Sequence, residues 1–359
     1  MATTVSGPLS EAATQRMIAK RRRNILTKAA ITLFALMLLS IYLMPLAYGA
    51  VTSVKSKQQV SDSTAPILPS ETVKYAYEGQ TYDVLQVPTE DGIQEWALVD
   101  KGRESSGFID PKNPDAGIIE WEGRWRTLEP VRELSIQWEN YPKAWNTIDF
   151  VRLLAFTLMY AVVTMIGAVG SSAFVAYGFS RFNFPYKNVL FIILIATIVL
   201  PPAVTLVPTY AFFISIGWGG TWLPLIVPQF FANAYNVFLL RQYFMTIPQN
   251  MEEAAKIDGA GPLRTFFSVI LPQAVPALVA VSLFHFFFAW NDFFGPLIYL
   301  AGNPDINPIT VGLTTFNGLY SSEPQLILAA SIITMILPLT IFFLAQRVFI
   351  QGIVVTGSK

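Results

Sequence analysis

Apolar and polar residues alternate along this chain in long blocks, and most of the apolar blocks are long enough to cross a membrane. The first lies within residues 25–51. Five more follow, at about residues 150–179, 189–214, 222–246, 266–300 and 326–350. A helix of about 20 residues crosses a hydrocarbon core of roughly 30 Å. The pattern therefore predicts an all-α polytopic membrane protein with six transmembrane helices, the last five within residues 150–350.

Residues 52–149 follow a different pattern. Apolar side chains there alternate with polar ones around three acidic-glycine pairs, Glu78-Gly79, Asp91-Gly92 and Glu122-Gly123. Such pairs between alternating residues are typical of β-hairpins. We expect a small β-rich domain, inserted between the first and second spans. Its aromatic residues could form a docking patch, but a domain of this size needs most of them for its core.

The distribution of basic residues predicts the orientation. Lysine and arginine occur before the first span (Lys20-Arg21-Arg22-Arg23) and in alternate gaps (Arg181, Lys187, Arg241, Lys256, Arg264, Arg347). The segment 301–325 and the linker 217–220 contain none. Cytoplasmic loops are enriched in basic residues. We therefore expect cytoplasmic tails at residues 1–24 and 351–359, a cytoplasmic loop at 247–265, and an extracytoplasmic β insertion.

A twin-arginine export signal at Arg22-Arg23 is the competing interpretation of the N-terminal region. The apolar run that follows exceeds the 7–15 residues usual for a cleaved signal, and further spans come after it. A retained first span is the better interpretation.

Composition excludes several kinds of chemistry. Of the 359 residues, 53% are hydrophobic and 13% charged, about half the charged fraction of a soluble domain. The chain has no cysteine and one histidine, His285, so cysteine and histidine-cluster metal sites are excluded. No G-x-x-x-x-G-K-[ST] motif is present. We expect no enzymatic activity, no cofactor or metal on this chain, and no nucleic-acid partner.

The polar segment between the fourth and fifth spans predicts a helix of about two turns. Asn250 is a suitable N-cap and Gly259 a suitable C′ residue. Met251, Ala254, Ala255 and Asp258 are spaced to share one face, and Glu252 and Lys256 are spaced to pair. A helix this short needs a surface to pack against. It is either an ordinary amphipathic loop helix lying on its own protein or a docking element for a partner.

The spacing in this loop resembles a known family signature. Glu253-Ala254-Ala255, Gly259 and then Ile270-Leu271-Pro272 resemble the EAA motif of permease subunits of bacterial ABC importers. The residue that normally separates the Ile and Leu is missing. Three other segments resemble the carbohydrate-uptake class, the maltose and multiple-sugar type: Asp258-Gly259-Ala260, Trp290-Asn291-Asp292-Phe293 and residues 345–352. The resemblance covers roughly residues 20–55 and 135–359.

That resemblance implies a function and a set of partners. The fold would be that of a type I ABC importer permease in the bacterial plasma (inner) membrane, surrounded by membrane lipid. Its partners would be a second homologous permease, two ATP-binding subunits that hold ATP and Mg, and an extracytoplasmic sugar-binding protein. Coupling to the ATPase would involve Glu252, Glu253, Ala254, Ala255, Asp258, Gly259 and Pro272.

Polar residues within the apolar segments are candidates for a substrate path, because they cost free energy unless they face protein or water. Two groups stand out: Gln229, Asn233 and Asn236 at i, i+4 and i+7, and Trp290, Asn291 and Asp292. An aromatic ring with amides suits a sugar. Helix–helix hydrogen bonding explains the first group better, and either role fits the second. For His285, a satisfied packing role is favoured over a proton relay.

Two other classes of protein compete with this interpretation. A stand-alone ion-coupled secondary transporter would need ionisable groups near the middle of the membrane, and Asp292 is the one candidate. A membrane-anchored β-domain acting as a sensor would leave five spans without a role.

Overall fold

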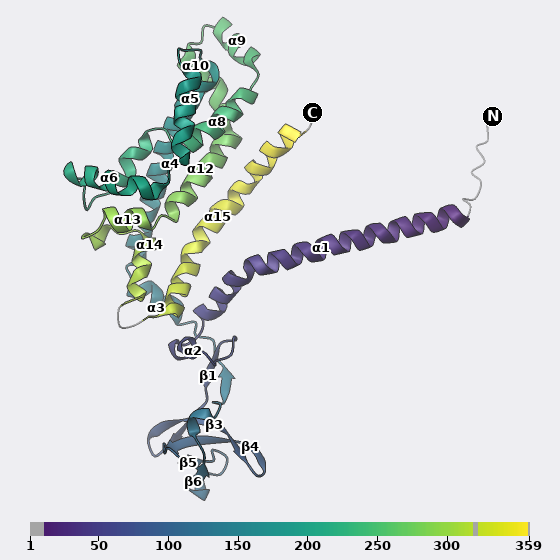
Figure 1. Ribbon diagram of the computed structural model, residues 1–359, viewed down its shortest axis with the longest axis vertical. Coiled ribbons are helices and arrows are strands. Elements are labelled where there is room, and N and C mark those ends of the chain that lie inside the picture. The colour runs from purple at the N-terminus through teal and green to yellow at the C-terminus, as the bar shows by residue number, and fades with distance from the viewer. Residues whose placement is uncertain (1–10, 319–321, 358–359) are drawn as a thin grey trace. The chain divides into compact units, whose positions relative to one another are not determined.

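The computed structural model describes residues 11–318 and 322–357, which belong to two compact units (Figure 1). The units are Met1–Gln137 and Trp138–Lys359. Parts of the two predicted tails, residues 1–10 and 358–359, lie outside the described residues. Helix reaches further into both tails than expected, because it begins at Glu11 and ends at Gly357.

The first unit begins with a long helix, α1 (Glu11–Ser53). Side chains of residues 19–48 on this helix are exposed, although most of those from Ala29 onward are apolar. An apolar helix without protein neighbours is typical of a segment that contacts lipid. After α1 comes the short helix α2 (Lys57–Ser61). Buried Gln59 fixes the linker to the sheet, since its amide donates to the carbonyls of Pro66 and Leu68 and its oxygen accepts from Ser70 N.

An antiparallel sheet forms the rest of this unit. Its strands are β2 (Lys74–Tyr77), β3 (Gln80–Thr89), β4 (Gly92–Asp100), β5 (Ser105–Ile109) and β6 (Ile119–Glu122), paired in chain order. A separate ladder joins β1 (Ser70–Thr72) to β7 (Arg132–Leu134). Leu85, Val87, Leu98 and Phe108 form the core, and Trp96 and Trp121 pack against it.

Two of the three acidic-glycine pairs form the hairpins that the sequence predicts. Glu78 and Gly79 have φ of 49° and 78° between β2 and β3, and Gly92 has φ of 113° between β3 and β4. The third prediction is wrong. Gly123 also has positive φ, but it leads from β6 into the 3₁₀ turn η2 (Trp125–Thr127) instead of a hairpin.

The second unit is helical. Its longer elements are α3 (Asn140–Thr147), α4 (Phe150–Arg181), α5 (Lys187–Ala196), α6 (Pro202–Ser215), α8 (Ala234–Thr246), α9 (Gln249–Ile257), α12 (Val275–Trp290) and α15 (Pro324–Gly357). Short elements between them are η3 (Thr197–Val199), α7 (Leu223–Ile226), η4 (Val227–Phe230), α10 (Pro262–Thr265), the π-helical η5 (Phe266–Ile270), α11 (Leu271–Gln273), α13 (Phe294–Tyr299), η6 (Pro304–Ile306), α14 (Ile309–Gly312) and η7 (Leu313–Phe316).

Helix α4 is the central element of this unit. It packs against both α8 and α12, and α12 packs against α15 (Figure 1). Small residues permit close packing: a Cβ at Gly167 would lie 2.8 Å from the Phe230 ring. Such contacts are typical of helices that associate within a membrane.

Among the described residues, four helices are long and apolar enough to cross a membrane. They are Ala19–Ser53, Phe150–Arg181, Leu223–Thr246 and Pro324–Arg347. Two bent pairs, Lys187–Val199 with Ala203–Ser215 and Pro262–Gln273 with Val275–Trp290, raise the number to as many as six. The chain therefore has a mostly helical membrane-protein fold with a β-sheet region near its N-terminus.

Three of the predicted continuous segments are interrupted. The segment 189–214 is bent at Pro201-Pro202, where neither residue can donate a backbone hydrogen bond. Within 266–300 the chain bends by 80° between α11 and α12 and breaks again after Trp290. Within 222–246 the helix is interrupted between η4 and α8.

Candidate functional site

The loop between α8 and α10 contains the short helix α9, whose ends are set by Pro248 and Gly259. Pro248 precedes the first residue, Gln249, and no side chain caps that end. The expected Asn250 cap is therefore wrong, because the N-cap position is Pro248, two residues earlier than predicted. At the other end Gly259 has φ of +76°. Its N–H donates to Lys256 O and the N–H of Ala260 donates to Ala255 O, which is a Schellman motif.

Glu252 points inward from α9 and does not pair with Lys256, as the spacing had suggested. Its Oε1 lies 2.5 Å from Nε of Arg181, the last residue of α4. The two side chains are only 6% (Arg181) and 8% (Glu252) exposed. A buried carboxylate needs a charged partner, which the guanidinium of Arg181 provides and an exposed Lys256 could not.

Arg181 also binds the end of α8. Its Nη2 donates to the carbonyl oxygens of Phe244 and Ile247, both at 2.7 Å. These carbonyls belong to the unsatisfied C-terminal end of a helix, where a cation is favourable. One guanidinium therefore joins α4, α8 and α9.

Tyr177, one turn before Arg181 on α4, holds the other end of the loop. Its hydroxyl donates to Pro262 O at 3.3 Å, and its ring lies 4.9 Å from that of Phe266. The loop is thus attached to α4 both before and after its exposed segment.

The remaining residues of α9 differ in burial, and the four residues predicted to share a face, Met251, Ala254, Ala255 and Asp258, are not buried alike. Met251 and Ala255 are partly buried, and Met251 packs against the core. The outward residues are Glu253, Ala254, Lys256, Ile257, Asp258 and Gly259. Ile257 is 86% exposed, and nearby Leu263 is 66% exposed. We call Glu253, Ala254, Ile257 and Asp258 the α9 outer face. Ile257 thus gives this face an apolar side chain open to contact, with polar groups around it, as at the rim of an interface.

Pro272 lies apart from that face. It is in α11, directly after the π-helical turn η5, and it is exposed. A π-helical turn and a proline together mark the position at which the fifth apolar segment bends.

The predicted trio Gln229, Asn233 and Asn236 does not lie on one helix. Gln229 belongs to η4, whereas Asn233 is the N-cap of α8 and accepts from the N–H groups of Tyr235 and Asn236. Asn233 N donates to Ser172 Oγ of α4 at 3.1 Å. The Asn236 side chain is buried, and its Nδ2 has no hydrogen-bond partner in the part of the chain that the structure describes. Asn233 thus links two helices.

Trp290, Asn291 and Asp292 lie at the break after α12. Trp290 is buried and stacks on Phe286 at 5.6 Å between ring centroids. Asn291 Nδ2 donates to Phe287 O. Asp292 accepts from the Tyr160 hydroxyl at 2.8 Å and from Gly295 N at 3.1 Å.

These contacts give Asp292 two structural tasks. Its carboxylate accepts from a backbone N–H in the first turn of α13 and ties the break to α4, and its backbone oxygen accepts from Thr310 Oγ1 at 2.8 Å.

His285 is buried in α12, with its ring centroid 6.2 Å from that of Phe288. Its Nε2 has no hydrogen-bond partner among the described residues, so the prediction of a satisfied histidine is wrong for this nitrogen. No group of three or more His, Cys, Asp or Glu residues that could hold a metal occurs among the residues searched, 11–318 and 322–357.

The sequence comparisons identify the family to which this helical membrane-type fold belongs. Residues 168–355 match the family described as "Binding-protein-dependent transport system inner membrane component". The chain belongs to this family and is an integral inner-membrane transport subunit, with ATP hydrolysis performed by a separate chain. The ion-coupled carrier is therefore not favoured.

Relatives with recorded functions support the same assignment. The chain is 33% identical over 256 residues to the osmoprotective compounds uptake permease protein GgtD of Synechocystis, covering 70% of this chain and 85% of GgtD. It is 31% identical over 236 residues to the sn-glycerol-3-phosphate permease protein UgpE of Pectobacterium atrosepticum, covering 64% and 82%.

A solved structure shares the fold. It is described as a bacterial ABC transporter involved in the import of the acidic polysaccharide alginate, and its matched chain aligns with a TM-score of 0.58 and 20% identity. The alignment covers 95% of this chain and 99% of the other.

Proposed function

We propose that this chain forms half of the translocation path of an ATP-driven importer for sugars or related polyols, and that the α9 outer face receives the force of ATP binding. The observation that carries the proposal is the joint at Arg181. There, α9 is attached by a buried ion pair to Arg181 of α4, and Arg181 itself donates two hydrogen bonds to the end of α8. Displacement of α9 is therefore passed to two long helices at once.

The outer face has the chemistry needed for docking on an ATP-binding subunit. Ile257 offers an apolar anchor, and Glu253 and Asp258 offer carboxylates to basic groups on the partner. Ala254 and Gly259 let the two backbones approach closely. On this proposal, closure of two ATP-binding subunits around ATP and Mg shifts the permease between two packings, inward-open and outward-open.

The complete assembly would contain this chain, a second homologous permease, two ATP-binding subunits and an extracytoplasmic sugar-binding protein. Residues 1–24, 247–265 and 351–359 would be cytoplasmic and residues 52–149 extracytoplasmic. The named substrates of GgtD and UgpE, osmoprotective compounds and a glycerol phosphate, and the alginate of the structural neighbour support a polar solute.

Reconstitution of the complex tests the proposal. The chain would be tagged, purified with its co-expressed partners, and placed in proteoliposomes with ATP on the side of α9. We expect sugar uptake that requires both ATP and the binding protein, and that is lost in Glu253→Lys. The control is Glu90→Lys, at an exposed position after β3. Uptake without an ATPase subunit would refute the proposal.

A further inference from the structure

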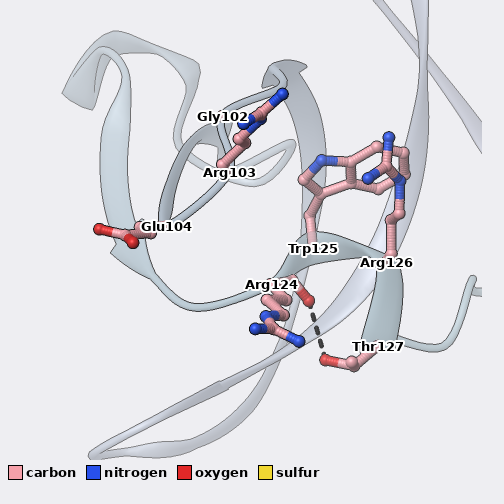
Figure 2. A pocket seen from close by; sticks show the side chains of 7 residues that line it. All are labelled: Gly102, Arg103, Glu104, Arg124, Trp125, Arg126 and Thr127. Carbon is pink, nitrogen blue, oxygen red and sulfur yellow. Dashed lines mark hydrogen bonds between the residues drawn. The ribbon is translucent and has the colours of Figure 1, made fainter.

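The β unit carries a cavity that the transport mechanism does not use. Its volume is about 610 Å³, and Figure 2 shows the residues that line it, Gly102, Arg103, Glu104, Arg124, Trp125, Arg126 and Thr127. A second cavity of about 310 Å³ also has Trp125 and Arg126 in its wall and adds Lys101, together with Asp83 and the paired Asp62 and Arg132. We call Lys101, Arg103, Arg124, Trp125 and Arg126 the basic cleft.

The charge of the cleft is opposite to that of the segment that contains it. Residues 52–149 hold 10 lysines and arginines against 17 aspartates and glutamates. None of the four cations of the basic cleft forms an ion pair within the described ranges, whereas Arg132 of the same unit pairs with Asp62. The carboxylate of Glu104 points away from Trp125 and Arg126 (Figure 2). The Arg124 guanidinium also points away from Trp125 (Figure 2), so the cations at the indole are Lys101 and Arg126, with Arg103 in the wall of the cavity. These unpaired cations leave a site for negative charge.

Trp125 holds the cations in place. Its indole packs against the core of the sheet, so the ring has a fixed position. The Arg126 guanidinium carbon lies 5.0 Å from the ring centroid and Lys101 Nζ lies 5.4 Å from it. Figure 2 shows the Arg126 guanidinium beside the indole. Cation–π contacts of this kind order side chains that would otherwise be mobile.

The cleft is formed by the loop after β4 and the loop after β6. Each loop contains a glycine that a larger residue could replace only if neighbouring atoms moved. A Cβ at Gly102 would lie 1.8 Å from Ser105 O. Gly123 has φ of +148°, and a Cβ there would lie 2.3 Å from the Trp121 ring. Gly123 N donates to Glu104 O at 2.7 Å, which ties the loops together. The cleft is therefore a defined structure of the unit.

We propose that the basic cleft binds a carboxylate-bearing saccharide. Guanidinium groups bind carboxylates through paired, charge-assisted hydrogen bonds. The partly exposed indole of Trp125 adds an apolar surface against which the apolar face of a sugar ring can pack. A hollow of this volume is in the range of small-ligand sites, whereas a protein partner meets a broader surface. This inference rests on the proposed function, which places the β unit outside and makes the transported solute a sugar.

A binding assay on the purified full-length complex tests the inference without transport. The probes are tri-galacturonate, a carboxylated trisaccharide, and maltotriose, a neutral one of the same length, measured by isothermal titration calorimetry. We expect saturable binding of tri-galacturonate that weakens as salt rises, and no binding of maltotriose. Loss of two charge-assisted contacts in Arg103→Gln/Arg126→Gln should weaken binding by about tenfold or more.

Two variants are controls. Lys112→Gln removes an exposed cation of the same unit outside the cleft, and it should bind as the wild type does. Arg126→Lys keeps the charge but loses the paired N–H donors of the guanidinium. Its affinity for tri-galacturonate should lie between that of the wild type and that of the double variant. Circular dichroism of each variant would establish that the sheet is intact.

Three outcomes would overturn the inference. They are absent binding of tri-galacturonate, equal binding by wild type and double variant, and equal binding of the neutral trisaccharide. A double variant that binds tri-galacturonate normally but no longer captures the sugar-binding protein would assign the cleft to a protein partner instead. Because no step needs ATP, failure here would leave the proposed importer function untouched.

Discussion

Arg181 and Glu252 are far apart in sequence but form a buried ion pair, with Nε and Oε1 2.5 Å apart. Leaving either charge without the other is costly, because a buried charge that loses its partner typically destabilises a protein by about 3–5 kcal/mol. The pair therefore fixes the angle at which α9 leaves the helical unit. Rigid attachment at this point is what lets a short helix transmit a displacement.

The first prediction concerns this pair. Arg181→Gln should destabilise the helical unit by about 3 kcal/mol, because it leaves Glu252 buried and alone and also breaks two hydrogen bonds to α8. Thermal unfolding of the purified complex and trypsin cleavage within 247–265 would measure the effect. Lys256→Gln should change stability by less than about 0.5 kcal/mol, because Lys256 is exposed. Equal effects of the two variants would show that the buried pair has no structural role.

The second prediction concerns docking. Ile257→Asp should weaken binding of the ATP-binding subunit by about tenfold or more, since an exposed isoleucine buried at an interface contributes about 1.5–3 kcal/mol. Co-purification at increasing dilution, or surface plasmon resonance, would give the affinity. The matched control is Ile93→Asp, in the β unit, where isoleucine is also exposed. Unchanged affinity for Ile257→Asp would place the ATPase elsewhere.

The third prediction separates backbone strain from steric contact at Gly259. A Cβ there meets nothing within 4 Å in the described chain, so the cost of substitution comes from φ of +76°. Gly259→Val should cost about 1–2 kcal/mol and reduce coupled ATP hydrolysis, whereas Gly259→Asn should retain most of it, because asparagine adopts this conformation more easily.

The measurement for Gly259 is binding-protein-stimulated ATPase activity in nanodiscs. If valine and asparagine are equally harmful, contact with the partner outweighs the backbone conformation at this position.

The sequence predicts much of this arrangement where short-range rules apply. The apolar segments, the β-rich insertion and the end of α9 at Gly259 follow from composition, alternation and glycine conformation. The partner of Glu252 could not be predicted that way, because local spacing favours Lys256 and the true partner comes from another helix. One signal was available: Arg181 ends an apolar segment in which charge is otherwise rare.

Helix breaks were the other limit of prediction from sequence. Gln229, Asn233 and Asn236 have helical spacing, yet the chain leaves the helix between Phe230 and Ala234. Apolar residues themselves do not mark where tertiary packing will interrupt an apolar run. Asn233 itself was the available hint, because asparagine is a strong N-cap residue.

The last prediction asks whether Asp292 is structural or contacts the solute. Its Oδ2 accepts from the Tyr160 hydroxyl and its Oδ1 accepts from Gly295 N. An asparagine here keeps the oxygen that accepts from Gly295 N, and its amide nitrogen can donate to the Tyr160 hydroxyl oxygen, so both contacts are retained without the charge. If the role is structural, Asp292→Asn should keep stability and uptake near wild type. Asp292→Ala should then lower stability by about 1–3 kcal/mol, because it leaves the donors without an acceptor. Thermal unfolding and uptake in proteoliposomes would be measured for both variants, with Asn291→Ala as the neighbouring control. Normal stability with lost uptake in Asp292→Asn would instead show that the negative charge is needed for transport, as an ion-coupled or solute-binding carboxylate requires.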